Sequence, residues 1–391
     1  MYVDDIAGGG RGKGTKSDPY REVQVGIDAA KDGDTLLISA GRYISQRYSF
    51  REKLCGNCQE HKTDVQASRG FLIENKRLTI IGASSDSTVL VTNAGYGVLF
   101  MNSRDSEISD LTITGGVRDQ DGSATDAAVV VKWGRVTIRG CLIADNTNRP
   151  ESITVGIGGI MGREGAELFV IDNEIKNNTW DGIALYRGAT AYIADNIING
   201  GRGAGIGITW DAVATVVRNR VSNYWKGIGS FGDTRVICSN NVVYDNLGWG
   251  IIATGTSYMD ATNNVVYHNG NCGMAIWSDE CTGRFSNNIV VENGWREQWV
   301  CPCVGIWNYG KLFNFDVSNN DVWNNKDSQY GDMPDYSDRN GNLNVDPKFE
   351  DTDDFKLAID SPLIDKGNPL ISDPDGTQSD PGIYGGPRAR R

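Results

Sequence analysis

Gly227–Asn241 reads GIGSFGDTRVICSNN, and Gly250–Asn264 repeats the same pattern as GIIATGTSYMDATNN. Each segment starts with a glycine, continues with alternating apolar residues, and reaches an asparagine fourteen places after the glycine. Seven segments share these two positions: Gly159 to Asn173, Gly182 to Asn196, Gly205 to Asn219, Gly227 to Asn241, Gly250 to Asn264, Gly273 to Asn287 and Gly305 to Asn319. Their glycines are 23, 23, 22, 23, 23 and 32 residues apart, so an internal repeat organises most of the chain.

The repeat predicts short β-strands that are stable only when they are stacked. Runs such as GIALY, GIGITW and GMAIW alternate in the way that half-buried strands do. Asparagine suits the turns because it tolerates the left-handed conformation, and stacked asparagines can bond one another in a ladder, in which Cys141 takes the place of one member. A period of 22–23 residues with three short strands per coil predicts an all-β, right-handed parallel β-helix. The LxxLxL consensus of the competing leucine-rich horseshoe is absent.

Both ends of the repeat are predicted to be capped. The segment SDPYREVQVGIDAAKDGD, residues 17–34, has helical spacing and runs into a strand, so we expect a helix that covers the open edge of the first coil. Residues 344–385 are expected to pack on and close the last coil. We therefore expect a single domain over 1–391, with an N-terminal cap and first strand in 1–45, regular coils in 77–325 and a C-terminal cap in 326–391.

The composition excludes several classes of protein. The chain of 391 residues carries 49 Gly and a formal net charge of −12, and no apolar run approaches the ~18 residues of a membrane span. Because nucleic-acid-binding surfaces are basic, we do not expect this acidic chain to bind nucleic acid. Because its apolar runs are short, we do not expect a membrane as a partner either. The first residues, MYVDD, lack the features of a signal peptide, while eight Cys favour an oxidising compartment. We expect an extracellular protein whose signal peptide is not part of this sequence.

Three stretches carry a resemblance to a known family. The N-terminal SDPYREVQVGIDAAKDGDTLLISAGRY, the GI…N coils and the closing NVDPKFED…LAIDSPLIDKG resemble the pectate-lyase-like right-handed β-helix superfamily over nearly the whole chain. Its members include polysaccharide lyases, glycoside hydrolases, esterases, C5-epimerases and phage tailspikes. The resemblance implies that a polysaccharide or oligosaccharide lies across the first parallel sheet, in a groove framed by loops. Fold alone does not decide among these activities.

The outward-facing positions of the coils supply the candidate site. Side chains two and four places after each coil's glycine point outward, and the next two positions form a turn. We predict substrate binding by aromatic and basic residues at and beside these positions: Tyr186, Trp210, Phe231, Trp277, Trp307, Tyr309, Arg163 and Lys132. We predict catalytic roles for residues in and beside the turns: Asp211, Asp233, Asp279, Glu280 and Arg187.

This combination favours hydrolysis of glycosidic bonds by carboxylates, without a required cofactor. Adjacent rungs of a parallel sheet are about 4.8 Å apart, so Asp211 and Asp233 should be one rung apart and Asp233 and Asp279 two. These spacings fit the carboxyl separations of retaining glycosidases, about 5–5.5 Å, and of inverting ones, about 6.5–9.5 Å. Aromatic rings offer flat apolar faces on which sugar rings can stack.

Two alternatives remain open. The resemblance also implies β-elimination on a uronic-acid polymer, with Lys132, Arg163 or Arg187 as the base and either Ca²⁺ or another basic group to neutralise the carboxylate of the substrate. The DDGxD-like cluster of calcium-dependent pectate lyases has only a partial counterpart in WDGIA, residues 180–184, where Asp181 matches. The second alternative is a glycan-binding or adhesive solenoid without catalysis.

The cysteines and long loops form a further constellation. CGNC (Cys55, Cys58) and CPC (Cys301, Cys303) could form a Cys₄ zinc site, but disulfides that pin loops are the favoured interpretation, with Cys272 and Cys281 as candidate partners. Loops longer than their neighbours in a solenoid tend to carry function, so we expect residues 118–126, 145–155 and 294–303 to form walls of the groove.

Overall fold

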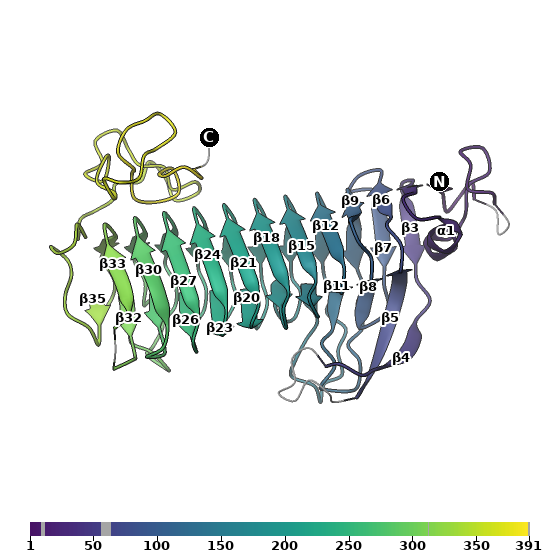
Figure 1. Ribbon diagram of the computed structural model, residues 1–391, viewed down its shortest axis with the longest axis horizontal. Helices are drawn as coiled ribbons and strands as arrows, with labels where there is room; N and C mark the ends of the chain where they lie inside the picture. The colour runs from purple at the N-terminus through teal and green to yellow at the C-terminus, as the bar shows by residue number, and fades with distance from the viewer. Residues whose placement is uncertain (9–11, 56–63, 312, 390–391) are drawn as a thin grey trace. The chain divides into compact units, whose positions relative to one another are not determined.

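The computed structural model describes residues 1–8, 12–55, 64–311 and 313–389 (Figure 1). The chain divides into two compact units, Met1–Arg202 and Gly203–Arg391. Each unit consists of short strands that stack in three mainly parallel sheets, as expected for a parallel β-helix. The single-domain organisation of the chain stays a prediction. No helix among the described residues is long and apolar enough to span a membrane.

The first unit has one helix, α1 (Val23–Ala29), and three sheets. Sheet 1 contains β4 (Tyr48–Glu52), β5 (Val65–Glu74), β8 (Tyr96–Met101), β11 (Ala127–Lys132), β14 (Gly158–Arg163) and β17 (Ile183–Leu185). Sheet 2 contains β1 (Tyr2–Val3), β2 (Thr35–Ile38), β6 (Thr79–Gly82), β9 (Ser106–Ser109), β12 (Arg135–Arg139), β15 (Glu167–Ile171) and β18 (Thr190–Ala194). Sheet 3 contains β3 (Gly41–Ile44), β7 (Thr88–Val91), β10 (Thr112–Thr114), β13 (Leu142–Ala144), β16 (Glu174–Lys176) and β19 (Ile197–Asn199).

The second unit repeats this order of strands. Sheet 1 contains β20 (Ala204–Trp210), β23 (Lys226–Gly232), β26 (Trp249–Thr254), β29 (Met274–Ile276), β32 (Val304–Asn308) and β35 (Ser328–Gly331). Sheet 2 contains β21 (Val213–Val217), β24 (Arg235–Ser239), β27 (Tyr258–Thr262), β30 (Thr282–Ser286) and β33 (Phe315–Ser318). Sheet 3 contains β22 (Arg220–Ser222), β25 (Val242–Tyr244), β28 (Val265–Tyr267), β31 (Ile289–Val291) and β34 (Asp321–Trp323).

The register of sheet 1 places like residues above one another. Ile228 pairs with Ile251, Ile251 with Met274 and Met274 with Ile306, and all four side chains are fully buried in the core. Burial of a side chain of this size contributes about 1.5–3 kcal/mol. The alternation read from the sequence therefore separates core positions from outward positions, which face the candidate site.

A ladder of buried asparagines joins successive coils at the turn between sheets 2 and 3. Nδ2 of Asn241 donates to Oδ1 of Asn264 at 3.0 Å, and Nδ2 of Asn264 donates to Oδ1 of Asn288 at 2.9 Å. The first unit has a ladder at the same turn, in which the backbone N–H of Cys141 donates to Oδ1 of Asn173 at 3.0 Å, as expected. The expected ladder is thus confirmed over much of its length.

Two members of the ladder were predicted at the wrong residue. Asn288 and Asn320 occupy the ladder, whereas Asn287 and Asn319 take the left-handed turn position with φ of 56° and 57°. The connection from sheet 1 to sheet 2 is one residue longer here. Ala253 pairs with Ile276 on sheet 1, and Tyr258 pairs with Thr282 on sheet 2. Tyr258 follows Ala253 by five positions, whereas Thr282 follows Ile276 by six. A single inserted residue therefore moved the ladder by one position.

A second ladder lies at the turn after sheet 3. Nδ2 of Asn246 donates to Asn269, Asn269 to Asn293 and Asn293 to Asn325, each at 2.9 Å. These residues follow the first ladder by five positions, in NNVVYDN, NNVVYHN, NNIVVEN and NNDVWNN. The sequence therefore encodes both ladders, although only the first was predicted.

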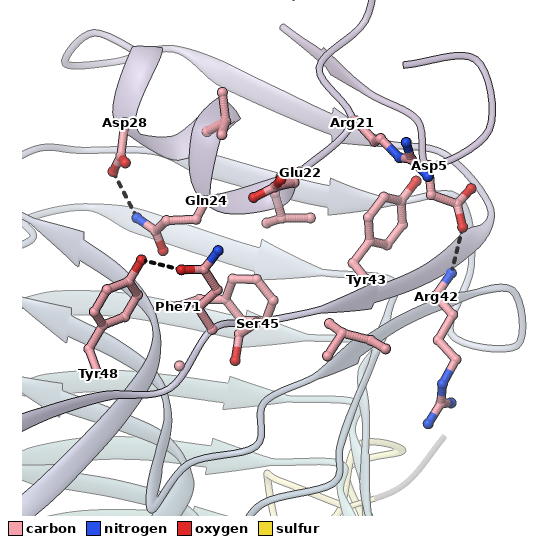
Figure 2. Close-up of a pocket in the computed structure, with 15 residues that line it drawn as sticks. Asp5, Arg21, Glu22, Gln24, Asp28, Arg42, Tyr43, Ser45, Tyr48 and Phe71 are labelled. Carbon is pink, nitrogen blue, oxygen red and sulfur yellow. Dashed lines mark hydrogen bonds between the residues drawn. The ribbon is translucent and has the colours of Figure 1, made fainter. Parts of the chain in front are cut away.

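The N-terminal helix α1 lies against the first strands of its unit, as expected (Figure 1). Its residues Val23, Gly26 and Ile27 are buried, and the amide of Gln24 both donates to the carbonyl of Leu72 and accepts from its N–H. Helix residues share a cavity of about 380 Å³ with the start of sheet 1. Figure 2 shows the residues that line this cavity. The helix therefore covers apolar surface at the beginning of the coils.

The C-terminal segment packs on the second unit at two places. Asn342 extends the asparagine ladder by accepting from Nδ2 of Asn320 at 3.0 Å, which continues the last coil. Further along the segment, Phe355, Leu363 and Ile383 pack in one buried cluster with residues of β25, β28 and β31. The segment thus closes the ladder and also covers the outside of sheet 3, an arrangement that the sequence did not predict.

Candidate functional site

The outward side of sheet 1 in the second unit carries a continuous aromatic cluster. Ring centroids are 6.0 Å apart for Trp225 and Trp249, 5.5 Å for Trp249 and Trp277, and 5.1 Å for Trp277 and Trp307. Tyr309 lies 5.4 Å from both Trp277 and Trp307. Most of these contacts are edge-to-face, which is a favourable geometry for aromatic pairs. We call this cluster, together with Phe231 and Trp299, the aromatic face.

The aromatic face has a buried layer and an exposed layer. Trp249 and Trp307 are only 4% and 2% exposed, and Nε1 of Trp307 donates to Asp332 at 2.7 Å. Tyr309 and Trp299, in contrast, are 61% and 67% exposed. The prediction of an aromatic surface therefore fits Phe231, Trp277 and Tyr309, whereas Trp307 supports the rings above it. Exposed apolar patches of this kind commonly mark binding sites.

Trp210 occupies a position that ordinarily favours glycine. Its φ is 66°, in the left-handed region, and it pairs in register with Gly232, whose φ is 96°. A bulky side chain in this conformation costs about 1–2 kcal/mol, and such strain is found most often at functional sites. The indole of Trp210 is half-buried at the end of β20. The left-handed backbone of this bulky residue supports a role for Trp210 in binding.

Two of the predicted catalytic acids follow this turn. Asp211 comes directly after Trp210 and Asp233 directly after Gly232, so the register puts the two acids on adjacent rungs, and both are exposed. Glu280 is also exposed, in the turn after β29. Asp279 is different, because its carboxylate accepts a hydrogen bond from the backbone N–H of Lys311 and its carbonyl accepts one from Asn314 at 2.8 Å. Asp279 therefore holds the loop that follows β32.

The predicted basic residues of the first unit are buried in an ion-pair cluster. Nζ of Lys132 lies 2.7 Å and Nη2 of Arg163 3.0 Å from Oε2 of Glu52, and all three side chains are at most 4% exposed. Burial, together with the charge of Arg163, lowers the pKa of Lys132. Neither cation presents its charge at the surface. Arg187 is half-buried in a turn with φ of 43°.

Tyr186 lies in a cavity of the first unit, close to two acids. The hydroxyl of Tyr186 is 3.5 Å from Oδ2 of Asp181, and burial, with the charge of Asp181, raises the pKa of the hydroxyl well above its usual value. The same cavity, of about 240 Å³, is lined by Trp180 and by Asp126, a residue that the sequence analysis placed only within an expected wall loop. The sequence predicts this loop, residues 118–126, as a wall of the groove because it is longer than its neighbours, and its acids give no separate signal.

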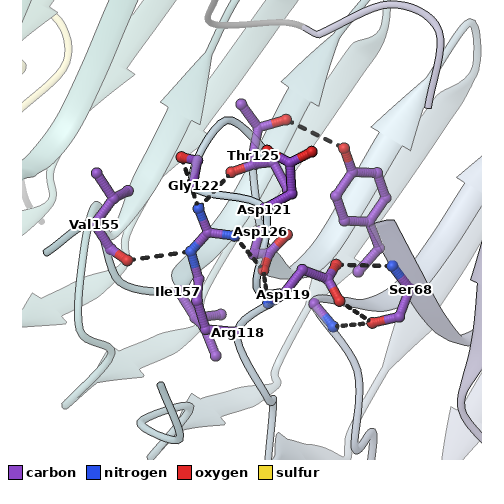
Figure 3. Close-up of polar contacts among 12 residues, drawn as sticks. Ser68, Arg118, Asp119, Asp121, Gly122, Thr125, Asp126, Val155 and Ile157 are labelled. Carbon is purple, nitrogen blue, oxygen red and sulfur yellow. Dashed lines mark hydrogen bonds and ion pairs between the residues drawn. The ribbon is translucent and has the colours of Figure 1, made fainter. Parts of the chain in front are cut away.

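Asp126 belongs to a buried network (Figure 3). Its Oδ2 accepts hydrogen bonds from Nη1 of Arg118 and from the backbone N–H of Asp119, both at 2.6 Å. Asp119 in turn accepts from Ser68 and from Arg47. Burial and the neighbouring charge of Asp119 raise the pKa of Asp126 well above its usual range, against the opposing effect of Arg118. The carboxyl group of Asp126 is therefore fixed in the interior of the first unit by Arg118 and by the backbone of Asp119.

The cysteines lie differently from the predicted arrangement. Sγ of Cys272 lies 3.5 Å from Sγ of Cys301, whereas Cys281 donates to the carbonyl of Gly255 at 3.3 Å. The pairing of Cys272 with Cys281 is therefore wrong, because the two thiols have different neighbours. Cys58 lies outside the described residues. Among the residues that are described, no group of three or more His, Cys, Asp or Glu side chains is placed to hold a metal ion.

We predict that Cys272 and Cys301 form a disulfide in an oxidising medium. Both thiols are buried beneath the aromatic face, and the bond would tie the 294–303 loop to the coil. Closing a loop of this length stabilises the folded state by about 3 kcal/mol. Peptide mapping under non-reducing conditions should find the linked pair, and Cys272→Ser should lower the free energy of unfolding by that amount. Cys281→Ser is the control, and equal loss in both variants would contradict the pairing.

Comparison with known proteins agrees with this architecture. The family model described as "Right handed beta helix region" matches residues 57–209 and 157–322, which together span more than half of the chain. The chain belongs to the right-handed beta-helix family. The resemblance to the pectate-lyase-like superfamily is thereby confirmed for the fold. None of the curated proteins matches the sequence.

Solved structures of other right-handed beta-helix proteins superpose on this chain at low identity. Pectate lyase Pel9A is 14% identical, with 100% of this chain and 97% of that chain covered and a TM-score of 0.54. The A-module of mannuronan C-5 epimerase AlgE4 from Azotobacter vinelandii is 14% identical, with 85% and 100% covered and a TM-score of 0.51. XylC in complex with xylose is 11% identical, with 90% and 88% covered and a TM-score of 0.50. These distant structural relatives are carbohydrate-active, and at such identities the likeness is one of fold.

Proposed function

We propose that this protein is an extracellular carbohydrate-active enzyme that binds a polysaccharide or oligosaccharide along the aromatic face and hydrolyses its glycosidic bonds. The observation that carries the proposal is the aromatic face, with the exposed acids Asp211 and Asp233 on adjacent rungs beside Phe231. Flat rings bind the apolar faces of sugars. Carboxylates at the turn are placed to donate a proton to the leaving oxygen and to assist the attack on the anomeric carbon.

The adjacent rungs support a close pair of acids. Backbones in neighbouring rungs of a parallel sheet are about 4.8 Å apart, which is near the ~5–5.5 Å separation of the carboxyl groups in retaining glycosidases. In that mechanism one acid attacks the anomeric carbon and the other protonates the leaving group, then activates the water that releases the sugar. Asp233 and Asp211 are our candidates for this pair. Glu280 and Asp279 lie further along the same side of sheet 1.

Hydrolysis is better supported than β-elimination. Elimination needs a base that reaches the substrate and a positive charge that neutralises its carboxylate. Lys132 and Arg163, the predicted bases, are buried against Glu52, so they serve the packing of the first unit. The half-buried Arg187 remains as a candidate for the lyase alternative.

Substitution of the two acids tests the proposal. Asp211→Asn and Asp233→Asn should each lower product formation by at least about a hundredfold, because general acid–base and nucleophilic groups contribute this much or more. Digestion of a panel of neutral and uronic polysaccharides should be followed both by reducing ends and by ultraviolet absorbance of unsaturated products. Trp277→Ala should raise KM more than it lowers kcat, because the ring binds the sugar rather than taking part in the bond change.

The matched control is Asp316→Asn, an exposed acid of β33 on sheet 2 of the same unit. This variant should keep full activity and an unchanged melting temperature. Unsaturated products would favour the lyase over the hydrolase. Full activity in both Asp211→Asn and Asp233→Asn would show that the acids are wrongly assigned, and binding without any product would support a glycan-binding protein.

A further inference from the structure

An open cleft lies at the turn between sheets 1 and 2 of the first unit, and the proposed function does not use it. Three successive coils contribute its lining residues, which are Arg104, Asp105, Trp133, Gly134, Arg135, Glu164, Gly165 and Glu167. We call it the turn cleft. Its volume of about 520 Å³ falls within the ~300–1,000 Å³ that is typical of sites for small ligands.

We propose that the turn cleft binds one ring of a saccharide, which stacks on the exposed indole of Trp133 and is hydrogen-bonded by the charged side chains around it. The choice of a saccharide rests on the proposed function, whereas the site itself rests on the geometry of the cleft. The site is additional to the aromatic face, whose residues belong to the second unit.

Trp133 takes a backbone conformation that a large side chain ordinarily avoids. It directly follows Lys132, which pairs with Met101 in the preceding coil, so Trp133 occupies the position of Asn102. The backbone angle φ is 51° at Trp133 and 52° at Asn102. Asparagine tolerates this left-handed region, whereas a bulky residue there is strained. Such strain is found most often at functional sites, and here it places an indole at the turn cleft.

The indole of Trp133 offers an apolar surface to a ligand, because the residue is 41% exposed. Nζ of the buried Lys132 lies 4.6 Å from the centroid of the ring and is also paired with Glu52 at 2.7 Å. The ring is therefore anchored from the interior of the unit. A cationic ligand is disfavoured, because the ring already attracts the charge of Lys132. The apolar C–H face of a sugar suits the exposed part of the ring.

Charged groups that a ligand can reach surround the ring. Arg135 pairs with Asp105 at 3.1 Å and with Glu167 at 2.7 Å, and these three side chains are 38–57% exposed. A guanidinium has five N–H donors and a carboxylate has two oxygens, so each group keeps hydrogen-bonding capacity for a ligand. Arg104 is also exposed at the turn cleft. The hydroxyl groups of a sugar both donate and accept, which matches neighbouring groups of opposite charge.

Titration of oligosaccharides into the full chain tests the inference. Disaccharides and tetrasaccharides of glucose, mannose, galactose and xylose, together with oligogalacturonates, should be titrated by calorimetry into the wild type and into Trp277→Ala. At least one saccharide should bind saturably to both proteins, because Trp277→Ala removes a ring of the aromatic face and leaves the turn cleft intact. The neutral and uronic members of the panel identify the kind of sugar that is bound.

Trp133→Asn separates binding from folding. Asparagine fits the left-handed turn, as Asn102 does, so the melting temperature of this variant should equal or exceed that of the wild type. The variant should nevertheless bind the saccharide at least about tenfold more weakly, because the ring is lost. Trp133→Phe keeps a flat ring and should stay within about threefold of the wild-type affinity. The matched control is Tyr48→Ala, which removes an aromatic ring of similar exposure, 44%, outside the turn cleft and should leave the affinity unchanged.

Unchanged affinity in Trp133→Asn would overturn the proposal, as would the absence of saturable binding by every saccharide of the panel. If Trp133→Asn melts below the wild type, Glu167→Gln decides, since this substitution leaves the ring in place. Glu167→Gln should weaken the binding about threefold, and an unchanged affinity would then reject the site.

Failure of the inference is distinguishable from failure of the proposed function. If every bound saccharide is lost in Trp277→Ala and unaffected in Trp133→Asn, all binding occurs on the aromatic face and the turn cleft is rejected. Digestion that depends on Asp211 and Asp233, without any binding that depends on Trp133, would leave the proposed function intact and refute the inference. Binding that depends on Trp133, without product from any polysaccharide, would support the inference and contradict the proposed hydrolysis.

Discussion

Asn264→Ala is expected to lower the free energy of unfolding by about 4 kcal/mol, because the substitution leaves several buried polar groups without partners. Asn264 is fully buried in the ladder. Its Nδ2 donates to the carbonyl of Cys238 and to Oδ1 of Asn288, both at 2.9 Å, and its Oδ1 accepts from the backbone N–H and Nδ2 of Asn241 at 3.0 Å. Alanine can replace none of these bonds.

Denaturant titration followed by circular dichroism measures this loss. The control is Thr282→Ala at the exposed start of β30, which should change the free energy of unfolding by less than about 0.5 kcal/mol. A loss below about 1 kcal/mol in Asn264→Ala would contradict the ladder as a main source of cohesion between coils. It would then follow that apolar stacking alone holds the coils in register.

Asp321→Asn is expected to stabilise the protein progressively as the pH rises. Asp321 is fully buried, its Oδ1 accepts from the backbone N–H of Val345 at 3.0 Å, and its Oδ2 has no partner among the described residues. Burial raises the pKa of Asp321 to about 7, with the N–H of Val345 opposing and the charge of Asp346 adding to the shift. The folded chain therefore holds a proton that the unfolded chain releases near its ordinary pKa of 3.8.

The sign of the effect follows from this difference. The contribution of the protonated Asp321 is fully present below the unfolded pKa and is lost as the pH rises through the folded pKa, near 7. At 1.36 kcal/mol per pKa unit, the complete loss is about 4 kcal/mol. Asparagine resembles the protonated acid and does not titrate. The advantage of Asp321→Asn should be small at pH 4 and reach about 4 kcal/mol at pH 9.

Free energies of unfolding measured between pH 4 and pH 9 test this expectation. Other titrating groups, including Asp126, contribute equally to both proteins and cancel in the difference. Asp338→Asn, at an exposed position of the C-terminal segment, is the matched control and should follow the wild-type profile. A constant difference between Asp321→Asn and the wild type across this range would show that Asp321 does not change its protonation on unfolding.

The local pattern of the sequence was sufficient to predict the coils. Each coil repeats the same alternation, and its strands pair with identical positions in the next coil, so the core residues Ile228, Ile251 and Met274 could be named without the structure. The ladder was predicted for the same reason. The prediction was wrong at Asn287 and Asn319 because one turn is longer by one residue, and a count from the glycine does not detect such an insertion.

The candidate site was less predictable, because burial and charge there depend on residues that are distant in the sequence. Lys132 and Glu52 form a buried ion pair although they are 80 residues apart in the sequence. Because of this ion pair, Lys132 is buried, whereas the sequence predicts an exposed cation at this position. Trp277 and Trp307 occupy similar outward positions, yet Trp307 is covered by its neighbours. The alternation of a strand tells which way a side chain points, but not what covers it.

The sequence by itself determined that this chain winds into coils with an aromatic outward side, because both properties repeat with the period of the coil. Only the tertiary structure decided which polar groups are exposed and which are buried. Asp126 is the clearest example: its carboxyl group is buried because it pairs with Arg118, which also donates to the carbonyls of Val155 and Gly122, and because Ser68, 51 residues before Asp119, fixes the neighbouring acid. Contacts of this kind follow no sequence period, since each depends on one particular loop folding against one particular strand.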